Sequence, residues 1–337
     1  MATRNIVPRA TGEGGIGTAV KKWALGWINT LIVTTINALT LSAQAIGFTL
    51  TGGTTPKTLT VDESVAMSAL ALKASLQNRN AIINGGFAIN QRAYVSAAAL
   101  ADGIYGHDRW KAGAGGGDYS FTQLAHNTVI TIAAEKTLIQ VIEDKNVVGG
   151  IYTLSWEGTA QGRYAVDSAT PAGDYADSPI AITGQTAGTT MSVEFDDGTL
   201  GKVQLESGTV ATAFEYRPIG QELALCQRYF WQYTGAGNDV LGFGHCYSTV
   251  AAEILFVHPV VMRTTPTHTN SGAADFRVWM ASAAPRATSA VSQDASYSGQ
   301  RASNLAIAIE TTDLVPGNST MLLTSDAGKW IAFSAEL

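Results

Sequence analysis

Acidic side chains are the first candidates for chemistry in this chain, because paired carboxylates can cleave glycosidic bonds. Such a pair must stand about 5 to 10 Å apart on a rigid wall. Adjacent carboxylates on a strand point to opposite faces, and each candidate here lies beside Gly, Asn or Ser, where turns are expected. We therefore interpret these residues as solvated turn residues and predict that the chain is not an enzyme. The candidate pairs are Glu143 with Asp144, Asp174 with Asp177, and Asp196 with Asp197.

Other catalytic and metal-binding patterns do not occur in the sequence. The histidines include no His-x-His or His-x-x-x-His spacing, and no Gly-x-Ser-x-Gly elbow is present. Cys226 and Cys246 form neither a metal-site spacing nor a disulfide framework, so we expect both to be reduced and structural. We predict no cofactor. A structural calcium ion remains open, with oxygen ligands near glycines but no EF-hand spacing, from Asp102, Asp108 and Asp118.

The segment His107-Asp108-Arg109-Trp110 allows two interpretations. In the first, Trp110 is a platform for a sugar ring, and Asp108 and Arg109 bind its hydroxyl groups. In the second, Trp110 is buried and an Asp–Arg pair beside it locks the first hairpins. We favour the second interpretation.

A glycan site is better sought among aromatic residues in loops. Sugar rings present apolar C–H faces, so their sites combine an exposed aromatic ring with a few polar groups that bind hydroxyls. Tyr297 lies in the Gly- and Ser-rich loop SQDASYSGQR, which has too little apolar content to be packed. We predict Tyr297 first and Trp279 second as ring platforms. The expected polar neighbours are Asp294, Gln300 and Arg301, and the alternative aromatic residues are Tyr105 and Tyr119.

The composition limits the class of protein. Charged residues make up only 14% of the chain, against about 25% in ordinary soluble domains, so we expect much surface to be buried against copies of the same chain. The net charge of −6 argues against nucleic acid as a partner. Residues 23–50 carry no charge, yet Leu and Ile alternate there with Thr and Asn as in strands; we expect no membrane insertion. The start of the chain lacks the apolar core of a signal peptide, which favours synthesis in a cytosol.

The elements that would position these residues begin with an assembly region. Residues 1–22 are expected to form a docking arm and residues 23–63 a β-stem too small to close a core in one chain. Residues 64–80 are expected to form a short trimeric coiled coil, because apolar residues recur there at coiled-coil spacing. This seam consists of Val65, Ala69, Leu72 and Leu76.

The rest of the chain is patterned as β-structure. Short strands separated by turn residues over 81–218 predict an antiparallel sandwich. Residues 219–232 predict a linking helix, with Leu223, Leu225 and Cys226 on its apolar side. Strands resume over 233–337 and predict a second sandwich. The expected fold class is mainly β: a stem with a short coiled coil, then two antiparallel, jelly-roll-like sandwiches joined by a helix.

Several runs of sequence resemble a known group of proteins. NAIINGGFAINQR (80–92), YGHDRW (105–110) and especially GKVQLESGTVATAFEYRPIGQELALCQRYFW (201–231) are similar to runs in phage tail-fibre and head-fibre proteins with carbohydrate-binding-type sandwiches. Ala213 stands where Pro is usual, and Gln221 where Glu is usual. The resemblance implies a virion fibre, commonly trimeric, and does not distinguish tail from head.

These observations together predict a homotrimeric subunit on the surface of a virion. Its N-terminal arm would bind a docking protein of the particle, and its outer module would attach to a host-surface glycan without cleaving it. Two alternatives stay open: a purely structural decoration of the capsid or baseplate, and a spike that depolymerises capsule.

Overall fold

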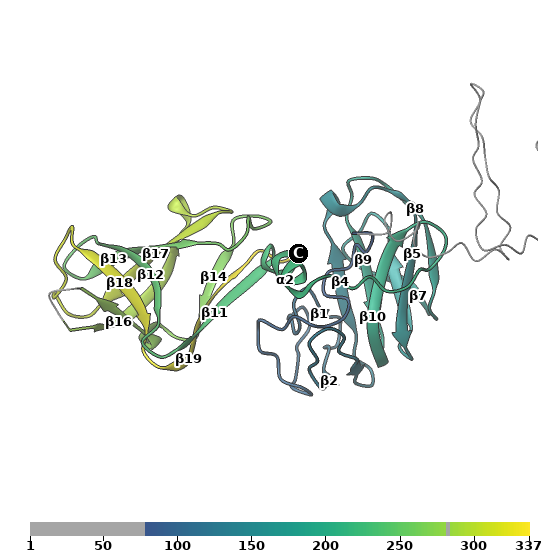
Figure 1. Ribbon diagram of the computed structural model, residues 1–337, viewed down its shortest axis with the longest axis horizontal. Coiled ribbons are helices and arrows are strands. Elements are labelled where there is room, and N and C mark those ends of the chain that lie inside the picture. Colours follow the sequence, from purple (N-terminus) through teal and green to yellow (C-terminus); the bar gives the residue numbers. More distant parts are fainter. Residues whose placement is uncertain (1–77, 281–283) are drawn as a thin grey trace, which may run out of the picture. The chain divides into compact units, whose positions relative to one another are not determined.

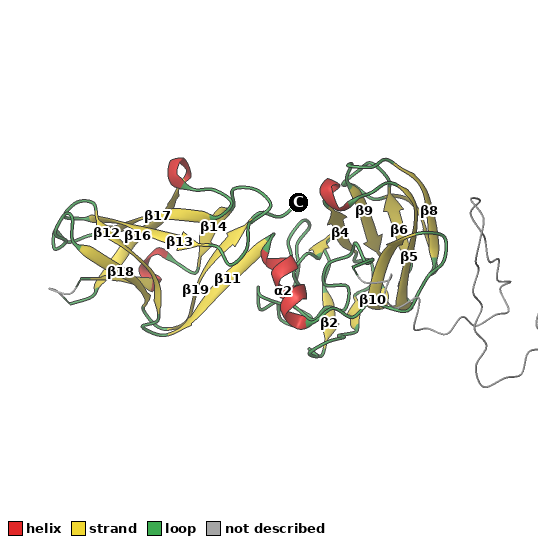
Figure 2. Cartoon of the chain, turned by 45° about the horizontal axis from the view of Figure 1, so that its top comes forward, coloured by secondary structure: helices red, strands yellow, loops and turns green. Residues whose placement is uncertain are grey.

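The computed structural model describes residues 78–280 and 284–337 (Figure 1). The expected arm at 1–22, the stem at 23–63 and the seam residues lie outside the described residues. These seam residues are Val65, Ala69, Leu72 and Leu76. Within the described part, the fold is mainly β, as predicted, with antiparallel sheets and the helix α2 (Figure 2).

The first module is a sandwich of two five-stranded sheets. One sheet has the order β1 (Lys111–Ala112), β4 (Leu138–Ile142), β9 (Met191–Phe195), β6 (Gly162–Ala165) and β7 (Ala172–Ala176). The other has the order β2 (Tyr119–Phe121), β3 (Ile130–Ile132), β10 (Gly198–Ser207), β5 (Gly150–Gly158) and β8 (Ile180–Gln185). Inward side chains of both sheets form one core, which includes Trp110, Leu154, Val193, Phe195 and Leu205.

A short 3-10 helix, η1 (Asp144–Asn146), follows β4, and the α-helix α2 (Ile219–Gln227) follows the sandwich. The predicted apolar side of α2 is confirmed: Cys226 is fully buried and packs with Tyr229, while Leu223 and Leu225 are partly buried against the same cluster. The helix ends earlier than the predicted residue 232, because the chain enters an extended strand at Phe230.

The C-terminal module differs from the expected second sandwich. Six of its strands form a closed barrel, in the order β12 (Val240–Cys246), β13 (Ala251–Val257), β17 (Ala302–Ile309), β16 (Arg286–Asp294), β15 (Phe276–Trp279) and β18 (Ser319–Thr324). The barrel closes because β18 pairs with both β12 and β15, which leaves these strands without a free edge.

Three further strands form a separate sheet in the order β11 (Phe230–Ala236), β19 (Ala327–Ser334) and β14 (Thr267–Asn270). Two 3-10 helices, η2 (Ala273–Asp275) and η3 (Ala295–Tyr297), occupy turns of this module. Among the described residues, no helix is both long enough and apolar enough to cross a membrane.

Candidate functional site

The loop that contains Tyr297 connects β16 to β17 and presents its aromatic ring to solvent. Tyr297 ends the 3-10 helix η3, and 71% of the residue is exposed. Gln300 and Arg301 follow on the same loop and are also exposed, whereas Asp294 is half-buried. The first-choice aromatic residue and two of its predicted polar neighbours thus lie on one loop, which starts after the third, Asp294.

Hydrogen bonds hold this loop in one shape. The carboxylate of Asp294 accepts from the backbone N–H of Ser296 at 2.8 Å and caps η3. The hydroxyl of Ser298 donates to the carbonyl of Asp294 at 2.6 Å and accepts from the backbone N–H of Asn304 at 3.1 Å. A loop fixed in this way presents Tyr297 with little ordering cost on binding.

The three polar neighbours of Tyr297 differ in whether their side chains are already hydrogen-bonded within the protein. Asp294 acts on the loop itself, and the side-chain amide of Gln300 donates to the carbonyl of Arg263 at 3.1 Å. Arg301 is exposed, and its backbone carbonyl accepts from the N–H of His258 at 2.9 Å. The Tyr297 ring and the Arg301 side chain therefore remain the groups best placed to meet a ligand.

Trp279 lies elsewhere on the barrel. It is half-buried at the end of β15, where it pairs with Met321 of β18. On its other side β15 pairs directly with the start of β16, through Arg277 with Ala287 and Val278 with Arg286. The Tyr297 loop follows Asp294, at the opposite end of β16 and roughly 25 Å along that strand, so the two predicted ring platforms do not form one site.

The two alternative aromatic residues lie in the sandwich, where one is buried and the other is half-buried. Tyr119 is 1% exposed, and its hydroxyl lies 2.7 Å from both the backbone N–H and the Nδ1 atom of His107. Tyr105 is half-buried, and its hydroxyl donates to the Leu337 carbonyl at 2.6 Å. Burial raises the pKa of both phenol groups.

The His107-Asp108-Arg109-Trp110 segment is buried throughout, which confirms the structural interpretation. The expected ion pair, however, is not between Asp108 and Arg109. Asp108 instead accepts from the N–H and side-chain amide of Gln91 at 2.7 and 2.8 Å, and lies 3.6 Å from Arg92.

Arg109 pairs with Glu336, far along the chain. It also lies 3.7 Å over the ring of Tyr229 and donates to the carbonyl of Val141 at 2.5 Å. Arg92 binds the same Glu336 carboxylate at 3.0 Å. We call Arg92, Asp108, Arg109 and Glu336 the buried ion cluster. Burial disfavours the charge of Arg109, but Glu336 outweighs this and raises its pKa.

The expectation that the paired carboxylates are turn residues is wrong for Asp174, which lies within strand β7 (Ala172–Ala176). Asp174, Asp177 and Asp197 are exposed, and Asp196 is half-buried, where it accepts from the backbone N–H of Gln161 at 2.6 Å. Burial raises the pKa of Asp196, with a further contribution from the neighbouring carboxylate.

Glu143 was expected to be a solvated turn residue, but it is buried and only 4% exposed. Its carboxylate accepts from Arg228 at 2.7 Å and from the Tyr229 hydroxyl at 2.6 Å. Burial acts to raise its pKa, but these hydrogen bonds outweigh burial and lower it. Asp144 beside it is exposed, so these two carboxylates do not form a pair.

No group of three or more His, Cys, Asp or Glu side chains within 78–280 and 284–337 is arranged to hold a metal ion. The calcium candidates have other contacts or lie apart from one another. Asp108 belongs to the buried ion cluster, and Asp118 accepts from the backbone N–H of Leu100 at 2.7 Å. Both cysteines are free and buried, as expected.

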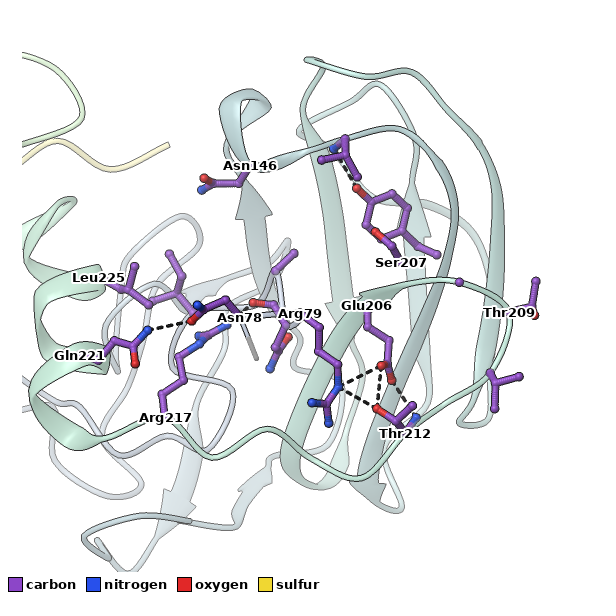
Figure 3. Close-up of a pocket in the computed structure, with 17 residues that line it drawn as sticks. Asn78, Arg79, Asn146, Glu206, Ser207, Thr209, Thr212, Arg217, Gln221 and Leu225 are labelled. Atoms are coloured by element: carbon purple, nitrogen blue, oxygen red, sulfur yellow. Dashed lines mark hydrogen bonds and ion pairs between the residues drawn. The ribbon is translucent and has the colours of Figure 1, made fainter. Parts of the chain in front are cut away.

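A cavity of about 710 Å³ lies where the residues before the first strand meet the end of β10 and α2 (Figure 3). Its polar wall is already bonded internally. The carboxylate of Glu206 accepts from Arg79 at 3.1 Å and from the hydroxyl of Thr212 at 2.7 Å. The amide of Gln221 donates to Asn78 at 2.9 Å. Sequence patterning did not indicate this cavity, because its lining comes from segments more than 100 residues apart.

The cavity does not resemble a sugar site. The aromatic residue in its lining, Tyr152, is 2% exposed, and its hydroxyl accepts from the backbone N–H of Val148 at 3.0 Å. A sugar platform needs an accessible ring face. The Tyr297 loop therefore remains the better candidate.

Comparisons with known proteins do not assign the chain to a family. No protein-family model and no curated protein matches it. Among solved structures, wild-type discoidin II from Dictyostelium discoideum aligns over 79% of this chain and 96% of its own, at 9% identity and a TM-score of 0.17. A TM-score this low establishes neither a shared fold nor a shared ligand.

Proposed function

We propose that this protein is a homotrimeric fibre or spike subunit of a phage-like virion, which attaches the particle to a host-surface glycan without cleaving it. The observation that carries the glycan proposal is Tyr297, whose exposed ring lies on a hydrogen-bonded loop that also carries the exposed residue Arg301. The virion assignment depends on the sequence resemblance. In that arrangement the N-terminal arm binds a docking protein on the particle, and the C-terminal module faces the host.

Tyr297 is expected to contribute to binding and not to folding. Tyr297→Ala should weaken binding by about 1–3 kcal/mol per site, which is roughly 5- to 150-fold, on a glycan array of bacterial surface polysaccharides. Tyr247→Ala is the matched control, because Tyr247 is 69% exposed on the barrel but outside the loop. Unchanged binding by Tyr297→Ala would remove the loop from the proposal, and an array with no binding to the parent protein would remove the glycan.

The proposal of a non-enzymatic subunit has its own test. Asp196→Asn combined with Asp197→Asn should change the free energy of unfolding by no more than about 0.5 kcal/mol, because an amide oxygen at 196 can still accept from Gln161. Glycan binding should persist. The measurement is reducing-sugar release from host polysaccharide. Release by the parent protein that the double variant abolishes would show that the chain is an enzyme.

A further inference from the structure

A continuous apolar stripe crosses the outside of the barrel. Directly paired residues on neighbouring antiparallel strands point to the same face. Trp279 on β15 pairs with Met321 on β18, Met321 with Phe243 on β12, and Phe243 with Leu255 on β13. Their chain neighbours are buried inside the barrel: Val278, Leu322, Gly242 and Ile254. The four paired side chains, which we call the barrel stripe, therefore all point outward.

The barrel stripe is unusually open for an apolar surface. Phe243 is 67% exposed and Leu255 53% exposed. The row beside it continues the apolar surface with Val257, which is 71% exposed, and the half-buried Leu323. On β17, by contrast, the outward positions next to these rows are mostly alanines: Ala302, Ala306 and Ala308. Large apolar side chains are thus concentrated on four of the six strands.

The chemistry of the barrel stripe suits a protein partner better than a sugar. None of its four side chains can bind hydroxyls through a carboxylate, guanidinium or amide group, which sugar sites need. Four neighbouring strands span about 15 Å, which matches the apolar centre of an interface that covers about 800 Å² on each partner. Charged residues make up only 14% of the chain. Another copy of the same chain therefore offers a largely uncharged surface that can cover this apolar centre.

Two charged residues at opposite corners of the barrel stripe favour a second copy of this chain. Glu253 on β13 lies two residues from Leu255, and Arg277 on β15 lies two residues from Trp279. Within the described part of the chain neither forms an ion pair; Glu253 only accepts from the Asn304 amide at 3.2 Å. Where the barrel stripe faces the axis of a cyclic oligomer, with its strands inclined to that axis, the β13 side of one copy meets the β15 side of the next, and Glu253 can pair with Arg277 of the next copy.

We infer that the barrel stripe is a self-association surface, through which copies of this chain pack head to tail around a symmetry axis. This inference deepens the proposed trimer, because it adds contacts in the C-terminal module to those expected from the seam Val65, Ala69, Leu72 and Leu76.

The test is sedimentation equilibrium of the full chain. Phe243→Asp should raise the concentration at half-assembly by about tenfold or more, because it places a charge in an apolar interface. Val95→Asp is the matched control: Val95 is 68% exposed on the sandwich, and its change should leave assembly as in the parent. Because Phe243 is exposed, Phe243→Asp should not change the midpoint temperature at which the monomer unfolds. Leu255→Asp gives an independent second variant.

A charge exchange tests the direction of packing. Glu253→Arg and Arg277→Glu should each weaken assembly, and the two changes combined should restore it. A parent that stays monomeric, or Asp variants at 243 and 255 that assemble like the parent, would overturn the inference. Failure of the combined variant to recover would overturn head-to-tail packing. If Phe243→Asp lowers glycan binding with assembly unchanged, the stripe is a ligand site and the inference fails. An assembled parent that binds no glycan contradicts only the proposed function.

Discussion

Replacing Arg109 by methionine is expected to lower the free energy of unfolding by about 3–5 kcal/mol, the usual cost of leaving one partner of a buried ion pair alone. The side chains of Arg109 and Glu336 are 2% and 7% exposed. Without the guanidinium, the Glu336 carboxylate keeps only Arg92, and the ring of Tyr229 loses the cation above it. Equilibrium urea unfolding followed by tryptophan fluorescence measures the loss.

The matched control for Arg109→Met is Arg286→Met. Arg286 forms an ion pair of 2.6 Å with Asp313, but both side chains are at least one-third exposed, so its loss should cost about 1 kcal/mol or less. Adding Glu336→Gln to Arg109→Met should recover part of the loss, because the unpaired charge is removed. Equal losses for Arg109→Met and Arg286→Met would show that the buried ion cluster contributes no more than a surface pair.

Acid is expected to destabilise the fold between pH 6.5 and pH 4. Burial lowers the pKa of His107, His258 and His268 from the ordinary 6.5 to about 4. The unfolded chain therefore binds more protons than the folded chain in this window, and stability is complete above it and falls as the pH decreases through it. For the fully buried His107 the loss is about 3 kcal/mol. Thermal unfolding over this pH range measures the effect.

His107→Gln separates this contribution from that of the carboxylates. A glutamine can still hydrogen-bond near Tyr119 and Gln123 but does not titrate, so the dependence of stability on pH between 6.5 and 4 should become shallower. His126→Gln is the control, because His126 is exposed. Glu143, whose pKa is lowered, loses its stabilising charge only as the pH falls through that lowered value. An unchanged slope in His107→Gln would contradict the assignment.

Local patterns determined a large part of this protein. Alternating apolar residues and frequent turn residues predicted β-structure throughout the described chain, because the period-two pattern of a strand is visible in the sequence itself. The helix of residues 219–227 and its buried Cys226 were predictable for the same reason. The exposure of Tyr297 followed from a loop too poor in apolar residues to be packed.

Tertiary structure alone decided the features that depend on residues far apart in the sequence. The barrel closes through β15 and β18, which are separated by two other strands in the chain, so no local pattern distinguishes it from a sandwich. Glu143 looked like a turn residue until Arg228 and Tyr229 came to lie against it. Arg109 and Glu336 meet across 227 residues, and the barrel stripe exists only because register aligns one residue from each of four strands. Pairing and register depend on the packing of the whole chain, and a local window of sequence does not contain them.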